Sequence, residues 1–394
     1  MINLAAADVR AGLGRYLLTG AGLGMLIGVT LTMAGVYRGM VDDARVLLRS
    51  AQADVWVVQR HTLGPFAEPS QLHDDVDRAI AGLPGVAATG RTTYSTMQVR
   101  HAGGDLRVMV AGFEPGRPGA PAFLVAGRPV TRAHYEAVAD ARTGLVPGDR
   151  VRIRRHEYAI VGLTQRMVSS NGDPMIFVPL KDGQDAQFLK DNEAIRNDRA
   201  RLAANPAFAP PEVRDAVAAL QTTNQSVNAV LVRVREGFDP ALVAQEIRRW
   251  KHLQAYTNAE MEEILVAKLI ATAAKQIGLF LVILAVVSAA IVAFILYTMT
   301  LGKLKEIAVL KLIGTRNATI AGMILQEALG LGLIGFLVGK IASLAWAPAF
   351  PKYVLALPED AARALVASLV IAAAASLLGI RAALRVDPAA AIGG

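Results

Sequence analysis

The uncharged stretch Gln276–Gly302, QIGLFLVILAVVSAAIVAFILYTMTLG, decides the fold class of this chain. A run of about 18 or more apolar residues is long enough to cross a bilayer as a helix. Three further runs have this character: Leu17–Tyr37, Asn317–Gly339 and the Ala-rich Ala364–Ile380. The last run alone is also compatible with a buried helix of a soluble domain, but it completes an even set. We therefore predict a membrane α-helical protein with four transmembrane helices.

The composition supports a membrane protein and excludes several chemistries. Hydrophobic residues make up 53% of the 394 residues and charged residues 19%, below the roughly 25% typical of soluble domains. Cysteine is absent, which excludes disulfides, Cys-ligated zinc, iron–sulfur clusters and thiol nucleophiles. The net charge of +8 comes with Lys and Arg that flank the apolar runs, so we read it as membrane orientation and expect no nucleic-acid partner.

The first apolar run is predicted to be an anchor that stays in the protein. Arg10 and Arg15 precede it, as in a signal peptide, but the run exceeds the ~7–15 apolar residues of a signal sequence and no A-x-A cleavage site follows. Basic residues gather before the first run, between the second and third, and after the fourth. By the positive-inside rule, both termini and the loop 303–316 are expected in the cytoplasm.

The orientation divides the chain into nine predicted segments. They are the cytoplasmic residues 1–16, a first span 17–39, an ectodomain 40–268, a second span 269–302, a cytoplasmic helix and loop 303–316, a third span 317–345, a short outer loop 346–361, a fourth span 362–383 and a cytoplasmic tail 384–394.

The large insert between the first two spans reads as an α/β domain. Strands are predicted at 53–59, 94–100, 106–112 and 228–235, with a hairpin over 151–163 after the turn Pro147-Gly148-Asp149. Helices are predicted at 70–83, 132–142, 184–202, 211–220 and 240–251. The stretch 259–275 is also helical in pattern, and we expect it to continue into the second span as one long helix.

Gly20, Gly24 and Gly28 lie four apart in the first span. Small residues at this spacing let helices in lipid approach closely, although glycine is also simply common in membrane helices. The spacing predicts a packing face and leaves open whether its partner is in the same protomer or a second one.

The loop KLKEIAVLKLIGT, residues 303–315, predicts a short amphipathic helix that ends at Gly314. Ile307, Leu310 and Ile313 fall on one face of it. Between two spans, such a helix is either an interfacial anchor or a docking element for a soluble partner, and the residues alone do not separate the two.

Residues 303–339 resemble the signature of ABC transporter permeases of the MacB/FtsX/LolC type, a "REIxVLxxIGA" coupling helix followed by a Glu-containing, Gly-rich third span. The closing RAALRVDPAAA, 381–391, is similar to the family's "AxxxxPxxAL". PGDRV, 147–151, with YAIVG, 158–162, is similar to its ectodomain motif. ADVWVVQ, 53–59, looks closer to the DevC/heme-exporter-like branch. Lys303 stands near the family's Arg, and Thr315 replaces its Ala.

The resemblance implies a bacterial inner-membrane protein with a large α/β periplasmic domain inserted between helices 1 and 2. It also implies a homodimer that works with a separate dimeric ATPase and transmits ATPase closure to the ectodomain, a process called mechanotransmission. The expected ATPase-coupling residues are Lys305, Glu306, Ile307, Leu310, Lys311 and Gly314. The chain contains no GxxxxGK[ST] phosphate loop, so we expect ATP and Mg to be bound by the partner and this chain to be non-catalytic, with no cofactor of its own.

Two further features are candidates for function. Glu327, an ionisable group in a span, matches the family's third-span Glu. We expect its side chain to extend to the cytoplasmic headgroups or to the coupling loop, and favour this over a role in a proton relay. Met33, Tyr37, Arg38 and Met40 lie near the outer end of the first span and are candidate substrate contacts, although packing and interfacial anchoring explain them as well. The scattered histidines and the absence of GxSxG predict neither a metal site nor a hydrolase.

We therefore predict the permease of an ABC exporter that extrudes a hydrophobic or amphiphilic substrate, lipid-, lipoprotein-, heme- or drug-like, with a periplasmic membrane-fusion or adaptor protein as a further candidate partner. One alternative is an FtsX-like signalling subunit that switches a periplasmic partner without transport. Another is a receptor-like membrane protein without an ATPase.

Overall fold

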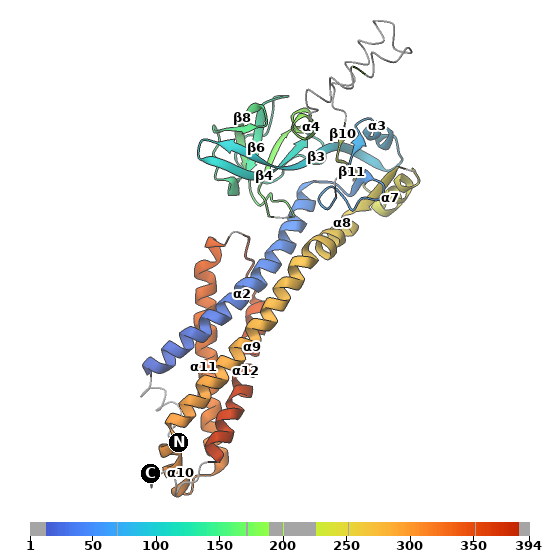
Figure 1. The fold of residues 1–394 in the computed structure, drawn as a ribbon. Coiled ribbons are helices and arrows are strands. Elements are labelled where there is room, and N and C mark those ends of the chain that lie inside the picture. Colours follow the sequence, from blue (N-terminus) through green and yellow to red (C-terminus); the bar gives the residue numbers. More distant parts are fainter. Residues whose placement is uncertain are drawn as a thin grey trace, which may run out of the picture. The chain divides into compact units, whose positions relative to one another are not determined.

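The computed structural model describes residues 13–68, 70–170, 172–188, 200, 226–250, 252–350 and 352–385 (Figure 1). The chain forms two compact units, one made of residues 1–40 and 272–394 and the other of residues 41–271. Each unit is described separately below.

The first unit is helical. Its helices are α2 (Leu13–Ser50), which continues into the second unit, α9 (Ala271–Gly302), α10 (Leu304–Leu312), α11 (Asn317–Trp346) and α12 (Pro358–Leu384), with a 3₁₀ turn at Ala347–Ala349. Among the described residues, four helices are long and apolar enough to cross a membrane: α2, α9, α11 and α12. The prediction of four such helices is confirmed, and α2 runs beyond the 17–39 range into the α/β unit.

The second unit is a mixed α/β domain. Its strands are β1 (Val55–Gln59), β2 (Leu72–His73), β3 (Val86–His101), β4 (Gly104–Phe113), β5 (Leu124–Gly127), β6 (Glu136–Asp140), β7 (Arg150–Ile153), β8 (His156–Thr164), β9 (Met175–Pro179), β10 (Ser226–Val227), β11 (Ala229–Val234) and β12 (Leu253–Thr257). Its other helical elements are α3 (Val76–Ala81), η1 (Ala141–Thr143), α4 (Leu180–Phe188), α7 (Pro240–Arg248), α8 (Asn258–Ile264) and the π-helical η3 (Leu265–Ile270).

The 16-residue strand β3 belongs to two parts of the sheet. Its first half continues the open order β12-β1-β11-β3, and its second half pairs with β4 and β7. The order β3-β4-β9-β6-β8-β7 then returns to β3, so these strands form a closed ring. One apolar core fills the ring, with Val99, Val151 and Ile160 among its members, and a second core lies between the open sheet and α7.

The sequence placed half of these strands, β1, β3, β4, β11 and the hairpin of β7 and β8, but the helix expected at 132–142 is wrong. Residues 136–140 form β6, whose five residues are all buried between β8 and β9. Burial on both faces removes the alternation that marks a strand, so a short apolar run reads as helix or strand equally. The same ambiguity hid the fully buried β9.

The other helix predictions had mixed outcomes. The helix expected at 240–251 is confirmed as α7, and the one at 70–83 shrinks to α3. The helix expected at 184–202 overlaps α4, which begins at Leu180 and is described as far as Phe188. The helix expected at 211–220 lies outside the described residues.

The chain stays helical from Asn258 to Gly302, as the sequence predicted. Thr257 opens α8 with a capping box: its side chain accepts from the Glu260 backbone N–H, and the Glu260 side chain accepts from the N–H of Thr257. A π-helical turn, η3, then joins α8 to α9.

Candidate functional site

The short helix α10 sits between α9 and α11 and has a well-defined end. Gly314 has φ of +88°, a left-handed conformation that favours glycine. Its N–H donates to the carbonyl of Lys311 at 3.0 Å, and the N–H of Thr315 donates to that of Leu310 at 3.0 Å. This pair of bonds is the Schellman C-cap, so Gly314 terminates the helix as its position indicated.

One side of α10 is buried against the bundle. Ile307 packs with Ile320 and Ile324 of α11 and with Ala383 of α12, and Ala308 is fully buried. The Nζ of Lys311 donates to the carbonyl of Leu384 in the last turn of α12 at 2.9 Å. The helix is therefore attached to both of the following long helices.

The opposite side of α10 carries an exposed apolar strip. Val309 is 46% exposed, Leu312 61% and Ile313 77%. We call these three residues the α10 strip; exposed Lys305 and Glu306 flank it. Ile307, Leu310 and Ile313, which the sequence places on one face, differ in exposure, because α10 turns Ile307 into the bundle, leaves Leu310 partly exposed and leaves Ile313 exposed. The periodicity showed an apolar helix but could not show which apolar residues α11 and α12 would cover.

Glu327 forms an ion pair with the residue that precedes α10. Its Oε1 lies 3.0 Å from Nζ of Lys303, with the two side chains 6% and 12% exposed. Lys303 Nζ also lies 3.4 Å from the hydroxyl of Tyr16 on α2. The pair thus connects α2, the start of α10 and α11. Glu327 therefore reaches the first residue of the loop 303–316.

The glycines of α2 lie against α11 of the same chain. A Cβ at Gly20 would lie 2.6 Å from Cγ2 of Ile334, and one at Gly24 would lie 2.9 Å from the carbonyl oxygen of Gly335. On the other side of this contact, a Cβ at Gly339 would lie 2.6 Å from the carbonyl oxygen of Gly24. Gly28 meets the Gly339 carbonyl and the Trp346 ring in the same way, each 3.0 Å from its would-be Cβ. The backbones approach so closely that only glycine fits, which is how small residues associate helices in lipid.

The outer end of this unit, by the predicted orientation, is also tightly joined. Arg38 makes a bidentate contact with Asp360 at the start of α12, Nε and Nη2 each lying 3.2 Å from a carboxylate oxygen. The N–H of Leu355 donates to the carbonyl of Gly35 at 3.0 Å. The Sδ of Met40 lies 3.8 Å from Nζ of Lys352.

A cavity of about 260 Å³ lies between α2, α11 and the segment before α12. Its walls are mainly apolar, with Lys340 and Asp360 as the charged groups; the apolar lining includes Leu31, Leu344, Leu355, Leu357 and Pro358. None of the four candidate substrate contacts lines this cavity. Met33 and Tyr37 are half-buried. Arg38 contacts Asp360, and Met40 contacts Lys352. The sequence missed Lys340, which reads only as the edge of an apolar run.

The sequence of this chain matches two family models and several known proteins. Residues 17–250 match the MacB-like periplasmic core domain, and residues 278–388 match the FtsX-like permease C-terminal family. Over 396 residues, covering 100% of both chains, the protein is 27% identical to a Mycobacterium tuberculosis protein named "uncharacterized ABC transporter permease Rv0072". It is 25% identical over 395 residues, again 100% of both chains, to "uncharacterized ABC transporter permease Rv2563" of the same species.

Two solved structures were also found. They are the extracellular domain of the noncanonic ABC-type transporter YknZ from Gram-positive bacteria, with a TM-score of 0.34, and the periplasmic region of MacB from Actinobacillus actinomycetemcomitans, with a TM-score of 0.35. They are 11% and 8% identical and cover 52% and 54% of this chain, and 100% and 91% of their own.

Four apolar helices, a helix clamped between the second and third, and an α/β domain inserted after the first define an ABC permease subunit. The chain belongs to the MacB/FtsX family of ABC transporter permeases. It is accordingly a multi-pass membrane protein with a MacB-like periplasmic domain, and membership implies a partner ATPase. The receptor-like alternative without an ATPase is thereby left without support.

Proposed function

We propose that this chain is the permease subunit of an ATP-driven export complex in a bacterial inner membrane, with both termini in the cytoplasm. Two copies work with an ATPase dimer, and closure of the ATPases moves the periplasmic domains to extrude a hydrophobic or amphiphilic substrate. The chain itself performs no catalysis.

The observation that carries this proposal is the α10 strip. Val309, Leu312 and Ile313 stay exposed although Ile307 and Ala308 of the same helix are buried. An interfacial anchor usually adds Trp or Tyr at the headgroup level, and α10 contains no aromatic residue. An apolar centre with Lys305 and Glu306 at its edge instead fits the apolar core and polar rim of a protein interface.

The contacts of α10 give a route for force from such an interface. Lys311 is attached to the end of α12, and the Lys303–Glu327 pair joins the start of α10 to α11. A displacement of α10 by a bound ATPase would therefore move α11 and α12 with it. The helical continuity of α2 to Ser50, and of Asn258 to Gly302, then provides covalent routes toward the periplasmic domain.

The cavity beside Lys340 supports an amphiphilic substrate. Its apolar wall suits a hydrocarbon chain, and Lys340 has no ion-pair or hydrogen-bond partner among the described residues, so it is available to an anionic group. Such a site favours transport over an FtsX-like subunit that only switches a partner. Affiliation with the DevC/heme-exporter-like branch and the periplasmic fusion partner stay predictions.

The test is co-purification of the permease with its ATPase, followed by measurement of ATP hydrolysis in Leu312→Asp and Ile313→Asp. A charge in the apolar centre of the interface should weaken assembly at least tenfold, which corresponds to about 1.4 kcal/mol. Asn317→Asp is the matched control, because it adds the same charge at an exposed position just after the helix.

Unchanged assembly and unchanged stimulation of hydrolysis in both strip variants would overturn this placement of the ATPase contact. If a thiol reagent added from the periplasmic side labels the variant Leu312→Cys, the predicted membrane orientation is wrong. A complex that assembles and hydrolyses ATP but moves no labelled amphiphile across reconstituted vesicles would support the signalling alternative.

A further inference from the structure

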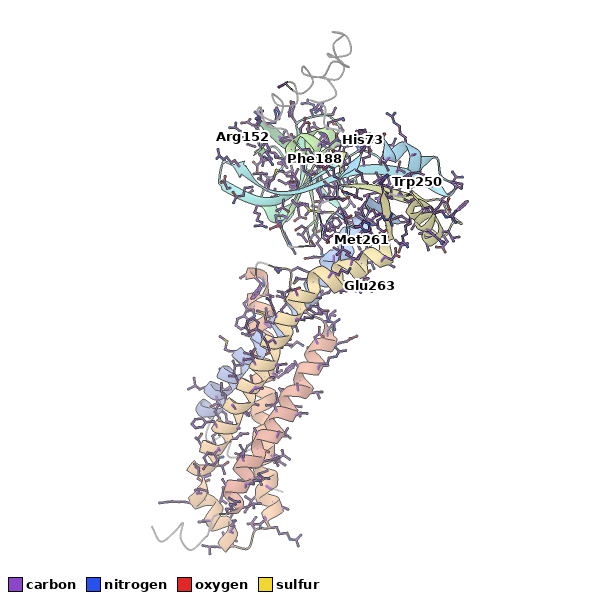
Figure 2. The ribbon with its side chains drawn as sticks, turned by 45° about the vertical axis from the view of Figure 1, so that its right-hand side comes forward. His73, Arg152, Phe188, Trp250, Met261 and Glu263 are labelled. Atoms are coloured by element: carbon purple, nitrogen blue, oxygen red, sulfur yellow. The ribbon has the colours of Figure 1, made fainter. Side chains whose placement is uncertain are left out.

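The ring of strands in the α/β unit closes through a single residue pair. Strand β7 pairs with β8 over four positions, but its pairing with β3 is limited to Arg100 opposite Arg152. The neighbouring Val99, Val151 and Ile153 point into the ring core and are fully buried. Because side chains alternate along a strand, Arg100 and Arg152 lie on the outside of the ring, where both are exposed. Figure 2 shows Arg152 at the outer margin of this domain.

This closing pair places two positive charges side by side. Like charges directly opposite each other in an antiparallel pair destabilise it. Each arginine also has a carboxylate opposite it on its other side, Asp105 opposite Arg100 and Glu157 opposite Arg152, which offsets part of this repulsion. Arg100 has only a loose contact with exposed Asp105, 3.8 Å away, and the nearby Glu157 lies 3.6 Å from Arg150. Arg152 has no ion-pair or hydrogen-bond partner in the described part of the chain.

The turn that follows β7 adds a second local cost. Residues 154 and 155 connect β7 to β8, and Arg154 has φ of +55°. Two-residue hairpins with positive φ at this position favour Gly, Asn or Asp, because a Cβ is unfavourable there. Strained positions of this kind gather at functional sites, where the side chain is retained for another reason than stability.

The three arginines line one hollow. A cavity of about 430 Å³ is formed by Met97, Gln98, Arg100, Arg152 and Arg154. In the antiparallel register set by Arg100 and Arg152, Gln98 falls opposite Arg154, two residues beyond the paired position. The hollow therefore opens where β3 and β7 stop pairing, and its size is within the range of small-molecule sites.

We propose that this arginine hollow binds a phosphate-bearing ligand on the periplasmic domain. Guanidinium groups present planar forks that match phosphate oxygens two at a time, which a lysine cannot do. A dianion between Arg100 and Arg152 removes the repulsion at the closing pair, so ligand binding also tightens the ring. A concave site of this size fits a phosphate group better than the flat acidic face of a protein.

The proposal does not depend on export, and it is tested on the full-length permease in detergent, without its ATPase. Hydrogen exchange of β3 and β7 peptides is followed while pyrophosphate or inorganic phosphate is titrated against chloride at equal ionic strength. At ten times its dissociation constant, a ligand that binds only the closed ring slows exchange through ring opening about tenfold.

Three variants test whether the arginines of the hollow hold the phosphate. Arg152→Thr removes one of the two guanidinium forks, so we expect phosphate no longer to slow exchange in β3 and β7. Arg154→Gly relieves the backbone strain and should stabilise the turn while weakening phosphate binding several-fold. Arg78→Thr removes the same charge from an exposed position on α3 and should leave the phosphate effect unchanged.

Separate ligands identify the source of the phosphate group. Protection by glycerol phosphate and pyrophosphate indicates a soluble ligand, and protection by short-chain phosphatidic acid but not phosphatidylcholine indicates a lipid headgroup; either supports the proposal. Protection by polyglutamate alone would overturn it in favour of an acidic protein partner. Equal loss of the phosphate effect in Arg78→Thr and Arg152→Thr, or no phosphate effect in the unmodified chain, would also overturn it.

Discussion

The helical unit and the α/β unit place their apolar side chains in opposite ways. In the helical unit, large residues such as Phe280 and Val286 are exposed along α9, while the contact between α2 and α11 is made by glycines. In the α/β unit, Val, Ile and Leu fill the sheet cores and arginines occupy the outer faces. The difference follows from the solvent, because lipid gives helices no hydrophobic reason to associate and close backbone packing must supply the cohesion.

Two ion pairs, one from each unit, differ strongly in exposure. Lys303 and Glu327 are almost fully enclosed in the bundle, whereas the side chains of Arg45 and Glu262, which join α2 to α8 in the α/β unit, are 49% and 38% exposed. A buried charge without its partner is costly, while an exposed one is solvated by water. The following expectations use this contrast, starting with the largest effect.

Glu327→Leu should destabilise the helical unit most. It leaves the Lys303 ammonium without its carboxylate, and breaking a buried pair from one side typically costs about 3–5 kcal/mol. The double variant Lys303→Met, Glu327→Leu should recover most of that loss. Unfolding of the purified permease in mixed micelles measures both. A double variant no more stable than the single one would show that the pair is not the main role of these residues.

Gly24→Ala should destabilise the bundle by about 1–3 kcal/mol, since its methyl group would lie 2.7 Å from Val338 and 2.9 Å from the Gly335 carbonyl. Gly22→Ala is the matched control on the same helix, because no described atom outside the helix lies within 4 Å of its would-be Cβ. The same unfolding assay compares them. Equal effects would mean that helix propensity, and not packing against α11, explains the glycines.

Glu136 should make the α/β unit sensitive to acid. Hydrogen bonds from Arg128 and from the backbone N–H groups of Thr131 and Arg132 hold the pKa of Glu136 at about 2, below its ordinary 4.5. A lowered folded-state pKa means that this stabilisation is complete above pH 4.5 and is lost as the pH falls toward 2.

Glu136→Gln should therefore cost about 1 kcal/mol at neutral pH, the difference between charge-assisted and neutral hydrogen bonds, and should flatten the pH dependence. Hydrogen exchange of β6 peptides between pH 6 and pH 2.5, corrected for intrinsic rates, gives the profile. Glu246→Gln, at an exposed position on α7, is the control and should follow the unmodified chain.

Arg45→Ala should have the smallest effect, at most about 0.5 kcal/mol, although Nε lies 2.6 Å from Oε1 of Glu262. Exchange in α8 peptides measures it, and raising the salt concentration should remove what effect there is. A loss above about 2 kcal/mol would contradict the contrast, because it would show that an exposed pair stabilises this domain as strongly as an enclosed one.

The sequence predicted the long helices because their apolar runs are a property of the chain alone. It also located α10 and its end, since Gly314 and the alternation of charged and apolar residues are local signals. It failed for β6 and β9, which are buried on both faces and lack a periodic pattern. It did not indicate which side of α10 is exposed, because Ile307 and Ile313 are equally apolar and only contact with α11 and α12 separates them.

By itself, the sequence determined the fold class, the four apolar helices and the position of the helix between the second and third, because length, hydropathy and caps act within a few turns of chain. Tertiary structure alone decided which residues meet: Glu327 with Lys303, Gly24 with Gly335 and Gly339, and Arg100 with Arg152. These pairs join residues from separate elements, and spacing along a chain does not encode the packing that brings such elements together.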